Sequence, residues 1–238
     1  MPEKSLHDLK QHLVQHYRWL RHYGGNDSHS GNASLRWHDQ IWVTPTGSCA
    51  DTLAAEDLVL CRLDGETGDG ASLDAPLHIA VYQQNPDARA IFHSHGPHAI
   101  ALSLDGEDFR PVDFEGQYYF PRVPVIDAPY ADYVPRSAEL ISNVLRDHRI
   151  TVYRGHGVYA QADSLNLAYK WTSSLELALR LISWQSAVQS LGISNMDKRV
   201  INLIKSSIND VADEGGWAFL GEVGTLILKK QPNFDARN

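Results

Sequence analysis

The feature that most constrains this chain is the stretch from Ile91 to His95, where two histidines alternate along a predicted strand. Successive side chains of a strand point to opposite faces, so His93 and His95 share one face, about 6–7 Å apart along the backbone. His156 lies between two glycines, which let the backbone turn sharply, and Asp74 precedes a predicted helix. Zinc and similar divalent metals bind imidazole together with carboxylate, and a catalytic site leaves one position open. The pattern indicates a metal site built from the three histidines, with Asp74 as a further candidate.

Two simpler interpretations stay open at this point. The chain contains 12 histidines, so a pair separated by one residue can also arise by chance. The apolar approach from Ala90 to Phe92 and the separate Gly-His-Gly turn favour a shared site. Asp74 stands two residues before Pro76, where a helix N-cap is expected, so capping is an alternative role for its carboxylate.

Length and charge limit the architecture and the partners. The 238 residues contain no linker, repeat or low-complexity run, so we expect one domain over residues 1–238. The 29 acidic and 21 basic residues give a charge of −8, which disfavours a nucleic-acid partner but not a local anion site. Two cysteines without a CxxC pair indicate neither a disulfide scaffold nor a cysteine zinc site. No signal peptide or membrane-spanning run is evident, so a cytoplasmic protein without a membrane partner is expected.

Hydrophobic periodicity predicts helices and short strands that alternate without a strict βαβ order. Several strands are joined by turns of hairpin length, as at Asp64-Gly65. The pattern favours an α/β protein of the α+β type, in which helices flank a mixed or antiparallel sheet. The predicted helices span about residues 6–20, 76–84, 97–104, 137–147, 164–191 and 196–213, and the strands lie near residues 35, 41–44, 58–63, 88–95, 123–126 and 150–153.

Two polar loops beside predicted strand ends are candidates for an anion site. Residues 26–34 and 45–48 offer hydroxyls, amides and backbone N–H groups, which are the donors that a phosphate needs. The same composition is ordinary turn chemistry. Both interpretations stay open from the residues alone.

Five separated motifs agree, in order, with those of one known family. They are Ser30-Gly31-Asn32-Ala33-Ser34, Trp42-Val43-Thr44-Pro45-Thr46-Gly47, Asp74 four residues before His78, His93-Ser94-His95 and Gly155-His156-Gly157. With them the chain resembles the class II aldolase/adducin family, which includes L-fuculose-1-phosphate aldolase and L-ribulose-5-phosphate 4-epimerase. The resemblance covers a core of about residues 6–190 and leaves a helical tail at 196–238.

The resemblance implies a central, mainly antiparallel sheet with helices on both sides, assembled as a C4 homotetramer with the active site at a subunit interface. It also implies a bound Zn²⁺, with Mn²⁺, Fe²⁺ or Co²⁺ as alternatives, and a catalytic acid–base at Asp74. The implied metal ligands are His93, His95 and His156, and the implied substrate-binding residues are Asn32, Thr46, Gly47 and Ser72.

Two departures from the family pattern concern the substrate. The family has two serines just before the acid, whereas this chain has Ser72-Leu73, which removes one hydroxyl from the implied phosphate site. The family also uses a tyrosine in its C-terminal tail, and this chain has no tyrosine after Tyr169. Another family tyrosine, contributed by a neighbouring subunit, falls near residues 114–119, so Tyr118 and Tyr119 are the candidate proton donors.

The function that follows is a metal-dependent aldolase, a carbon–carbon lyase of carbohydrate metabolism. It would cleave a ketose 1-phosphate to dihydroxyacetone phosphate and an aldehyde through a metal-stabilised enediolate. Three alternatives stay open: a sugar-phosphate 4-epimerase, a metal-dependent decarboxylase or oxygenase of a keto or phenolic acid, and a non-catalytic scaffold as in adducin. Asp74 favours the epimerase, and the aromatic residues near the expected site suit a less polar substrate.

Overall fold

The computed structural model describes residues 5–190, 198–212 and 220–231. Contacts within the chain divide it into two compact units, residues 1–184 and 185–238. All the site residues predicted from the sequence lie in the first unit.

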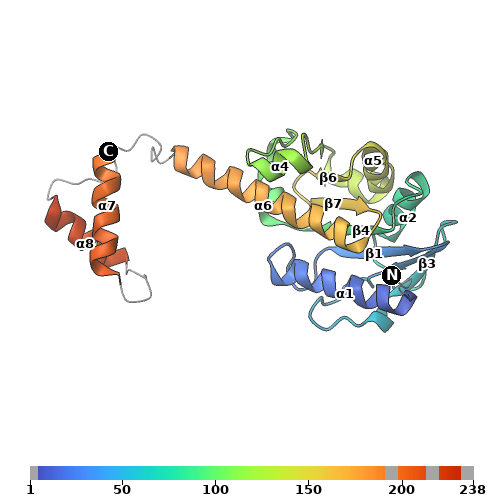
Figure 1. Ribbon diagram of the computed structural model, residues 1–238. Coiled ribbons are helices and arrows are strands. Elements are labelled where there is room, and N and C mark those ends of the chain that lie inside the picture. Colours follow the sequence, from blue (N-terminus) through green and yellow to red (C-terminus); the bar gives the residue numbers. More distant parts are fainter. Residues whose placement is uncertain (1–4, 191–197, 213–219, 232–238) are drawn as a thin grey trace. The chain divides into compact units, whose positions relative to one another are not determined.

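A seven-stranded sheet forms the centre of the first unit, with the strand order β3-β2-β1-β4-β7-β6-β5 (Figure 1). All neighbouring strands run antiparallel except β5 and β6, which are parallel. The predicted mixed, mainly antiparallel sheet is therefore confirmed. The strands are β1 (Asn32–Trp37), β2 (Gln40–Val43), β3 (Val59–Arg62), β4 (Ala90–Ser94), β5 (Val125–Ile126), β6 (Ile150–Tyr153) and β7 (Gly157–Ala162).

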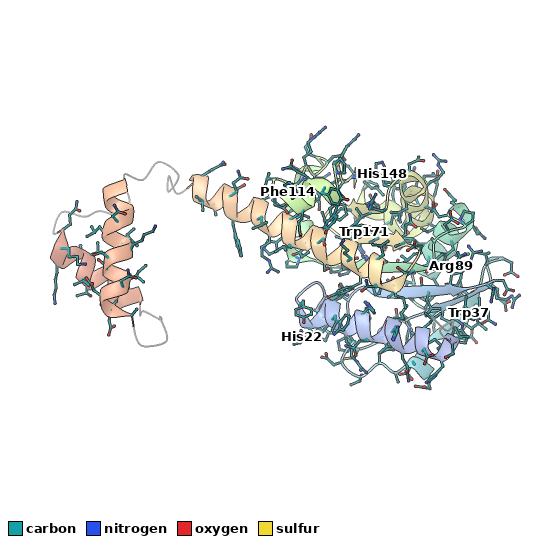
Figure 2. The ribbon with its side chains drawn as sticks, viewed as in Figure 1. His22, Trp37, Arg89, Phe114, His148 and Trp171 are labelled. Atoms are coloured by element: carbon teal, nitrogen blue, oxygen red, sulfur yellow. The ribbon has the colours of Figure 1, made fainter. Side chains whose placement is uncertain are left out.

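Helices cover both faces of this sheet because the alternating side chains of its strands form two separate apolar clusters. One cluster joins Phe92 of β4 to α1 (Leu6–His22) and α6 (Leu165–Ser190). Trp171 of α6 belongs to the same cluster (Figure 2). The other cluster joins Ile91 of β4 to α2 (Ala75–Gln84) and α5 (Tyr133–Asp147). The second face is the one that His93 shares with Ile91, so the histidines project toward the α2 and α5 side.

Two elements were not predicted, and one helix begins earlier than expected. Strand β7 and helix α4 (Phe114–Tyr119) are absent from the sequence-based assignment, whereas helix α8 (Leu220–Lys230) lies within the expected helical tail at 196–238. Five of the six β7 residues are buried, so no alternation of polar and apolar residues marks the strand. Helix α5 begins at Tyr133 rather than at Ser137, because Pro135 fits within its first turn. The remaining short helices are α3 (Pro97–Leu102) and three 3₁₀ turns at Ala55–Asp57, Ser103–Asp105 and Tyr130–Asp132.

The described part of the second unit contains two helices, α7 (Lys198–Val211) and α8. The ammonium group of Lys230 on α8 donates to Ser206 and Asp210 of α7 at 2.5 and 2.6 Å. The predicted helix over residues 196–213 agrees with α7, and its ends at 196–197 and 213 lie outside the described residues. Among the helices of the described ranges, none is long and apolar enough to cross a bilayer.

Candidate metal centre and active site

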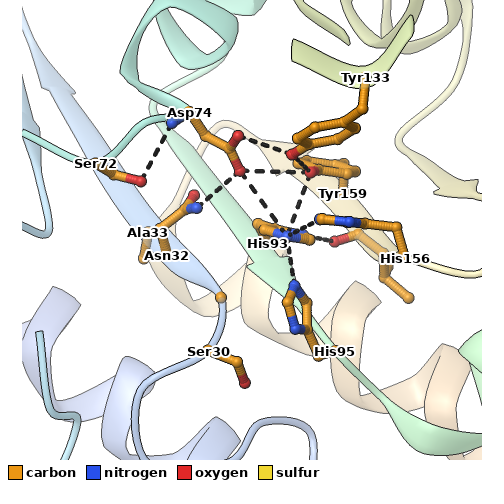
Figure 3. A network of polar contacts seen from close by, with 12 residues as sticks. Ser30, Asn32, Ala33, Ser72, Asp74, His93, His95, Tyr133, His156 and Tyr159 are labelled. Atoms are coloured by element: carbon orange, nitrogen blue, oxygen red, sulfur yellow. Dashed lines mark hydrogen bonds and ion pairs between the residues drawn. The ribbon is translucent and has the colours of Figure 1, made fainter. Parts of the chain in front are cut away.

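Three neighbouring strands bring the three predicted metal ligands and Asn32 together at one end of the sheet (Figure 3). In the ladder, His93 of β4 is opposite Asn32 of β1 on one side and Tyr159 of β7 on the other. His95 follows the last residue of β4, and His156 lies in the turn between β6 and β7. The three histidines, separated by up to 63 positions, therefore meet because the sheet places their strand ends side by side.

The three imidazole rings converge through their Nε2 atoms. Nε2 of His93 lies 2.9 Å from Nε2 of His95 and 3.0 Å from Nε2 of His156, and the three ligand atoms all lie within 4.8 Å of one another. Zn–N bonds of about 2.0–2.1 Å in a tetrahedral arrangement hold ligand nitrogens about 3.3 Å apart. The two distances from His93 are thus only a few tenths of an ångström shorter than in such a site, and the full set of three atoms lies within 4.8 Å. The cluster is compatible with a divalent metal, as the sequence predicted.

The protonation of the rings also suits a metal. The carbonyl of Val158 accepts a hydrogen bond from Nδ1 of His93 at 3.0 Å, which leaves the lone pair of Nε2 directed at the cluster. Burial lowers the pKa of His93 well below its usual value, and the nearby carboxylate of Asp74 opposes this only in part. Burial and the neighbouring His95 lower the pKa of His156 to about 4. The net lowering of both pKa values favours the neutral imidazole, which is the form that binds a metal.

The glycines around His156 have separate structural reasons. Gly155 has φ +65°, a left-handed conformation that favours glycine. A Cβ atom on Gly157 would overlap the carbonyl oxygen of Ser94 and lie 3.0 Å from the ring of His95. The predicted sharp turn and close backbone approach are therefore both present.

Asp74 occupies the N-cap position of α2, but its side chain makes no capping hydrogen bond, so the capping interpretation is wrong. Its carboxylate turns instead into the site, where Oδ2 accepts from the Asn32 amide at 2.8 Å and lies 3.9 Å from Nε2 of His93. Oδ1 accepts from the hydroxyl of Tyr133 at 2.8 Å. Burial raises the pKa of Asp74, but His93 and the hydrogen bond from Asn32 outweigh it and hold the pKa below its usual value. Asp74 is therefore a buried, ionised carboxylate beside the histidine cluster.

Two tyrosines that the sequence analysis missed complete this network. The hydroxyls of Tyr133 and Tyr159 lie 2.5 Å apart, and that of Tyr159 is 3.4 Å from Oδ2 of Asp74. The ring of Tyr159 stacks on His93 with centroids 4.0 Å apart, and the ring of Tyr133 stacks on His156 at 4.4 Å. Burial raises the pKa of both tyrosines, so both hydroxyls are protonated donors. Tyr159 follows Gly157 by two residues, so the two positions share one face of β7. Recognition of β7 in the sequence would therefore have placed the Tyr159 side chain on the same face as the site.

Comparison with known protein families agrees with this geometry. A model of the class II aldolase and adducin N-terminal domain matches residues 11–182, well over half of the chain. The chain belongs to the class II aldolase and adducin family. A second model, of the OST-HTH/LOTUS domain, matches residues 193–238, which lie in the second unit.

Individual members of the class II aldolase family are 28–32% identical to this chain over the aligned residues. A 3-oxo-tetronate 4-phosphate decarboxylase from Haemophilus influenzae is 32% identical over 179 residues, 72% of this chain and 85% of that protein. An L-fuculose phosphate aldolase from Escherichia coli K12 is 28% identical over 180 residues, 73% of this chain and 81% of that protein. The crystal structure of L-fuculose-1-phosphate aldolase from Thermus thermophilus aligns with a TM-score of 0.71 and 32% identity, covering 76% of this chain and 96% of that one.

Of the residues that the class II aldolase resemblance implied for substrate binding, Asn32 and Ser72 contact Asp74, and Thr46 and Gly47 lie on a loop joined to the segment of Ser72. Backbone N–H groups of Thr46 and Ser72 donate to Gly70 and Thr44 at 2.9 and 3.1 Å, which joins the two loops. Thr46 and Gly47 are exposed, whereas the Ser72 hydroxyl accepts from the N–H of Asp74 at 3.3 Å. The fourth residue, Asn32, donates a hydrogen bond from its amide N–H₂ group to the carboxylate of Asp74. Its Oδ1 is buried without a hydrogen-bond partner among the described residues.

The two tyrosines predicted as proton donors lie on α4. Tyr118 has 79% of its side chain exposed, and Tyr119 packs against Trp171 with the ammonium of Lys170 4.0 Å from its ring centre. Within the described residues, neither tyrosine forms a hydrogen bond or ring contact with the histidines or with Asp74. The tyrosines that touch the acid within this part of the chain are Tyr133 and Tyr159.

Proposed function

We propose that this chain is a metal-dependent carbon–carbon lyase whose first candidate activity is the aldol cleavage of a ketose 1-phosphate to dihydroxyacetone phosphate and an aldehyde. The observation that carries the proposal is the convergence of three imidazole Nε2 atoms beside a buried, ionised carboxylate. Histidine nitrogens with one open position bind zinc in hydrolases and lyases alike, so Zn²⁺ is the proposed metal, with Mn²⁺, Fe²⁺ or Co²⁺ as alternatives. The family membership supports a reaction of this class.

Each polar group of the site has a part in the proposed reaction. The cation held by His93, His95 and His156 would act as a Lewis acid toward a carbonyl oxygen of the substrate. The carboxylate of Asp74 takes the proton from the carbon next to that carbonyl in the condensation direction, and returns it in the cleavage direction. Tyr133 and Asn32 hold the two carboxylate oxygens at 2.8 Å each, which fixes the base in one orientation. Because the carboxylate is already oriented, it does not have to rearrange when the proton moves.

The polar loops beside Asp74 support a phosphorylated substrate. Thr46 and Gly47 offer an exposed turn of small residues, and the segment of Ser72 is hydrogen-bonded to it. We assign the substrate phosphate to this turn. The buried Oδ1 of Asn32, which lacks a partner among the described residues, is an acceptor for a hydroxyl of the substrate.

The proton donor to the aldehyde oxygen stays assigned to Tyr118 or Tyr119. The exposure of Tyr118 supports its reaching the site of a neighbouring copy, which agrees with the proposed C4 homotetramer and an active site at the subunit interface. The substrate is the only partner in the proposal apart from other copies of this chain.

The experiment that tests the proposal is an assay of the metal-loaded protein with a panel of ketose 1-phosphates, in which dihydroxyacetone phosphate is detected. Asp74→Asn is the negative control, because it keeps the side-chain size but removes the base, and we expect it to lower the rate about 10²–10⁴-fold. Asp69→Asn, in an exposed loop, should leave the rate unchanged. Absence of product from every substrate with a fully metal-loaded protein would contradict aldolase activity.

A second candidate activity is decarboxylation of a phosphorylated 3-oxo acid. The observation that supports it is the 32% identity to the Haemophilus influenzae decarboxylase, which equals that to the Thermus thermophilus aldolase. Both reactions leave negative charge on the carbon next to a carbonyl, so the same cation and the same Asp74 would serve either. Release of carbon dioxide from a 3-oxo acid phosphate, without dihydroxyacetone phosphate from any ketose, would assign the chain to this reaction instead.

A further inference from the structure

Helix α3 begins two residues after His95, and its own sequence provides no cap. Its N-cap residue is Gly96, which has no side chain, and no capping side chain from within the segment is present. The first N–H groups of a helix have no partner inside the helix and need one elsewhere. Pro97 has no N–H, so the groups that need partners are those of His98 and Ala99.

Glu176 supplies both partners from the middle of α6. Its carboxylate accepts from the backbone N–H of His98 at 3.0 Å and from that of Ala99 at 3.2 Å. The ring Nδ1 of His98 lies 2.7 Å from the same carboxylate. Glu176 is only 6% exposed, and a buried carboxylate is stable there only because these donors compensate for its lost hydration. A side chain 77 and 78 positions away thus caps the helix that follows the metal-ligand motif.

The same carboxylate explains the glycine at position 96. Gly96 has φ −55°, a conformation open to any residue, so the backbone does not require glycine. A Cβ atom there would overlap Oε2 of Glu176 and lie 2.8 Å from its carboxyl carbon. The space in which a side chain would begin is filled by the Glu176 carboxylate.

His95 depends on this segment because it lies outside the sheet. Strand β4 ends at Ser94, so the strand ladder no longer holds the backbone of His95. Its N–H donates instead to Oδ1 of the buried Asn26 at 2.7 Å, and the residue after it is already in contact with Glu176. From this backbone, the His95 ring has to place Nε2 2.9 Å from Nε2 of His93.

We propose that Glu176 is a positioning residue of the metal centre: by fixing the backbone from Gly96 to Ala99, it sets the direction from which His95 reaches the cation. It does not touch the cation or the substrate. The inference rests on the proposed metal centre, and deepens it by adding a residue from α6 that no motif of the sequence includes.

The first test measures the affinity for cobalt(II), through the visible absorption of the tetrahedral ion, in the full-length protein. Glu176→Gln keeps the size of the side chain but replaces one acceptor oxygen by an N–H₂ group that faces backbone donors. We expect the cobalt affinity to fall about 10–100-fold, as for other groups that orient metal ligands. Glu139→Gln is the matched control, since that exposed carboxylate of α5 only pairs with Arg136 at 3.9 Å, and its cobalt affinity should stay unchanged.

The second test is a double-variant cycle between Gly96 and Glu176. Gly96→Ala alone should weaken cobalt binding because the new methyl group displaces the carboxylate. In a Glu176→Ala background the same substitution should have little further effect, since the obstacle is gone. Additive effects of the two substitutions would contradict the proposed contact.

The melting temperature of the metal-free protein separates positioning from mere stability. A Glu176→Gln variant that melts earlier without metal, yet binds cobalt as tightly as the parent, would overturn the positioning role and leave the proposed metal centre intact. Failure of the parent protein itself to bind cobalt would refute the metal centre, and the positioning role with it.

Discussion

At the scale of single residues, the site differs from a simple histidine cluster by its buried acid. Asp74 is held by hydrogen bonds to both oxygens, one from Asn32 of β1 and one from Tyr133 at the start of α5. Hydrogen bonds to a charged carboxylate favour the ionised form. The same contacts that orient the base therefore also keep it ready to accept a proton.

This arrangement predicts the effect of Tyr133→Phe on the pH dependence of the reaction. Loss of the hydroxyl that donates to Asp74 raises the pKa of the carboxyl, because the ionised form loses a stabilising hydrogen bond. The base is active when ionised, so activity is lost as the pH falls through its pKa. The acidic limb of the kcat/KM profile in the condensation direction should move to higher pH, with a rate loss on the order of tenfold. Tyr130→Phe is the control, because Tyr130 is 94% exposed. If the pH profile of Tyr133→Phe coincided with that of Tyr130→Phe, the role of Tyr133 in lowering the pKa of Asp74 would be refuted.

At the scale of the elements, the sequence predicts the metal centre better than the network around the acid. His93 lies on a short strand and His95 directly follows its last residue, in a locally alternating pattern, and His156 stands in a turn marked by glycines, so all three are visible without the fold. Tyr159 belongs to β7, where five of six residues are buried and no alternation marks a strand. The early start of α5 at Tyr133 was hidden by Pro135, which looks like a helix breaker but fits the first turn.

Long-range pairing was also beyond the sequence. The order β1-β4-β7 places Asn32, His93 and Tyr159 in one row across three strands. Each of these strands is short and joins the others through segments of very different length, so periodicity alone does not fix the register. Glu176 is hidden for the same reason, since its partners at the start of α3 are 77 and 78 positions away. Only the resemblance to a known family connected residues this far apart.

The packing of α2 against β1 predicts an acid-sensitive stability. His78 of α2 is fully buried, with Nδ1 2.6 Å from the hydroxyl of Ser34, and burial lowers its pKa to about 4. An unfolded histidine has a pKa near 6.5, so the unfolded state gains its proton first as the pH falls. The stabilisation is complete above about pH 6.5 and is lost progressively toward pH 4.

His78→Asn should remove this dependence, because the amide occupies the position of Nδ1 but does not titrate. Between pH 7 and pH 5 the parent should lose about 2 kcal/mol more unfolding free energy than the variant. Urea unfolding at both pH values measures this difference in unfolding free energy, with a chelator present to remove metal. The other histidines are the same in both proteins, so their contributions cancel when the parent and the variant are compared. His22→Asn, at an exposed residue, should leave the parent's pH dependence unchanged. Equal losses for the parent and His78→Asn would mean that His78 is protonated or exposed in the folded protein.

At the scale of the whole molecule, the candidate site lies in one part of the chain. The described residues of the site run from Asn32 to His156 and Tyr159, all inside the compact unit of residues 1–184. The class II aldolase model ends at residue 182, whereas the OST-HTH/LOTUS model covers residues 193–238. In the second unit, Lys230 of α8 pairs with Asp210 of α7. The three histidines of the described cluster and Asp74 thus all belong to the first unit.

A chain that ends at Ser190 should therefore bind cobalt(II) with the affinity of the full-length protein. The cut keeps all of α6, including Glu176 and its contacts with the segment after His95. Cobalt titration of both chains measures this, with far-ultraviolet circular dichroism as the check that the shorter chain is folded. His156→Ala in the shorter chain is the control for binding at the histidine cluster, and should weaken binding strongly because one of three ligands is lost. A folded shorter chain that binds cobalt poorly would show that residues 191–238 stabilise the site, as expected for a single domain over residues 1–238.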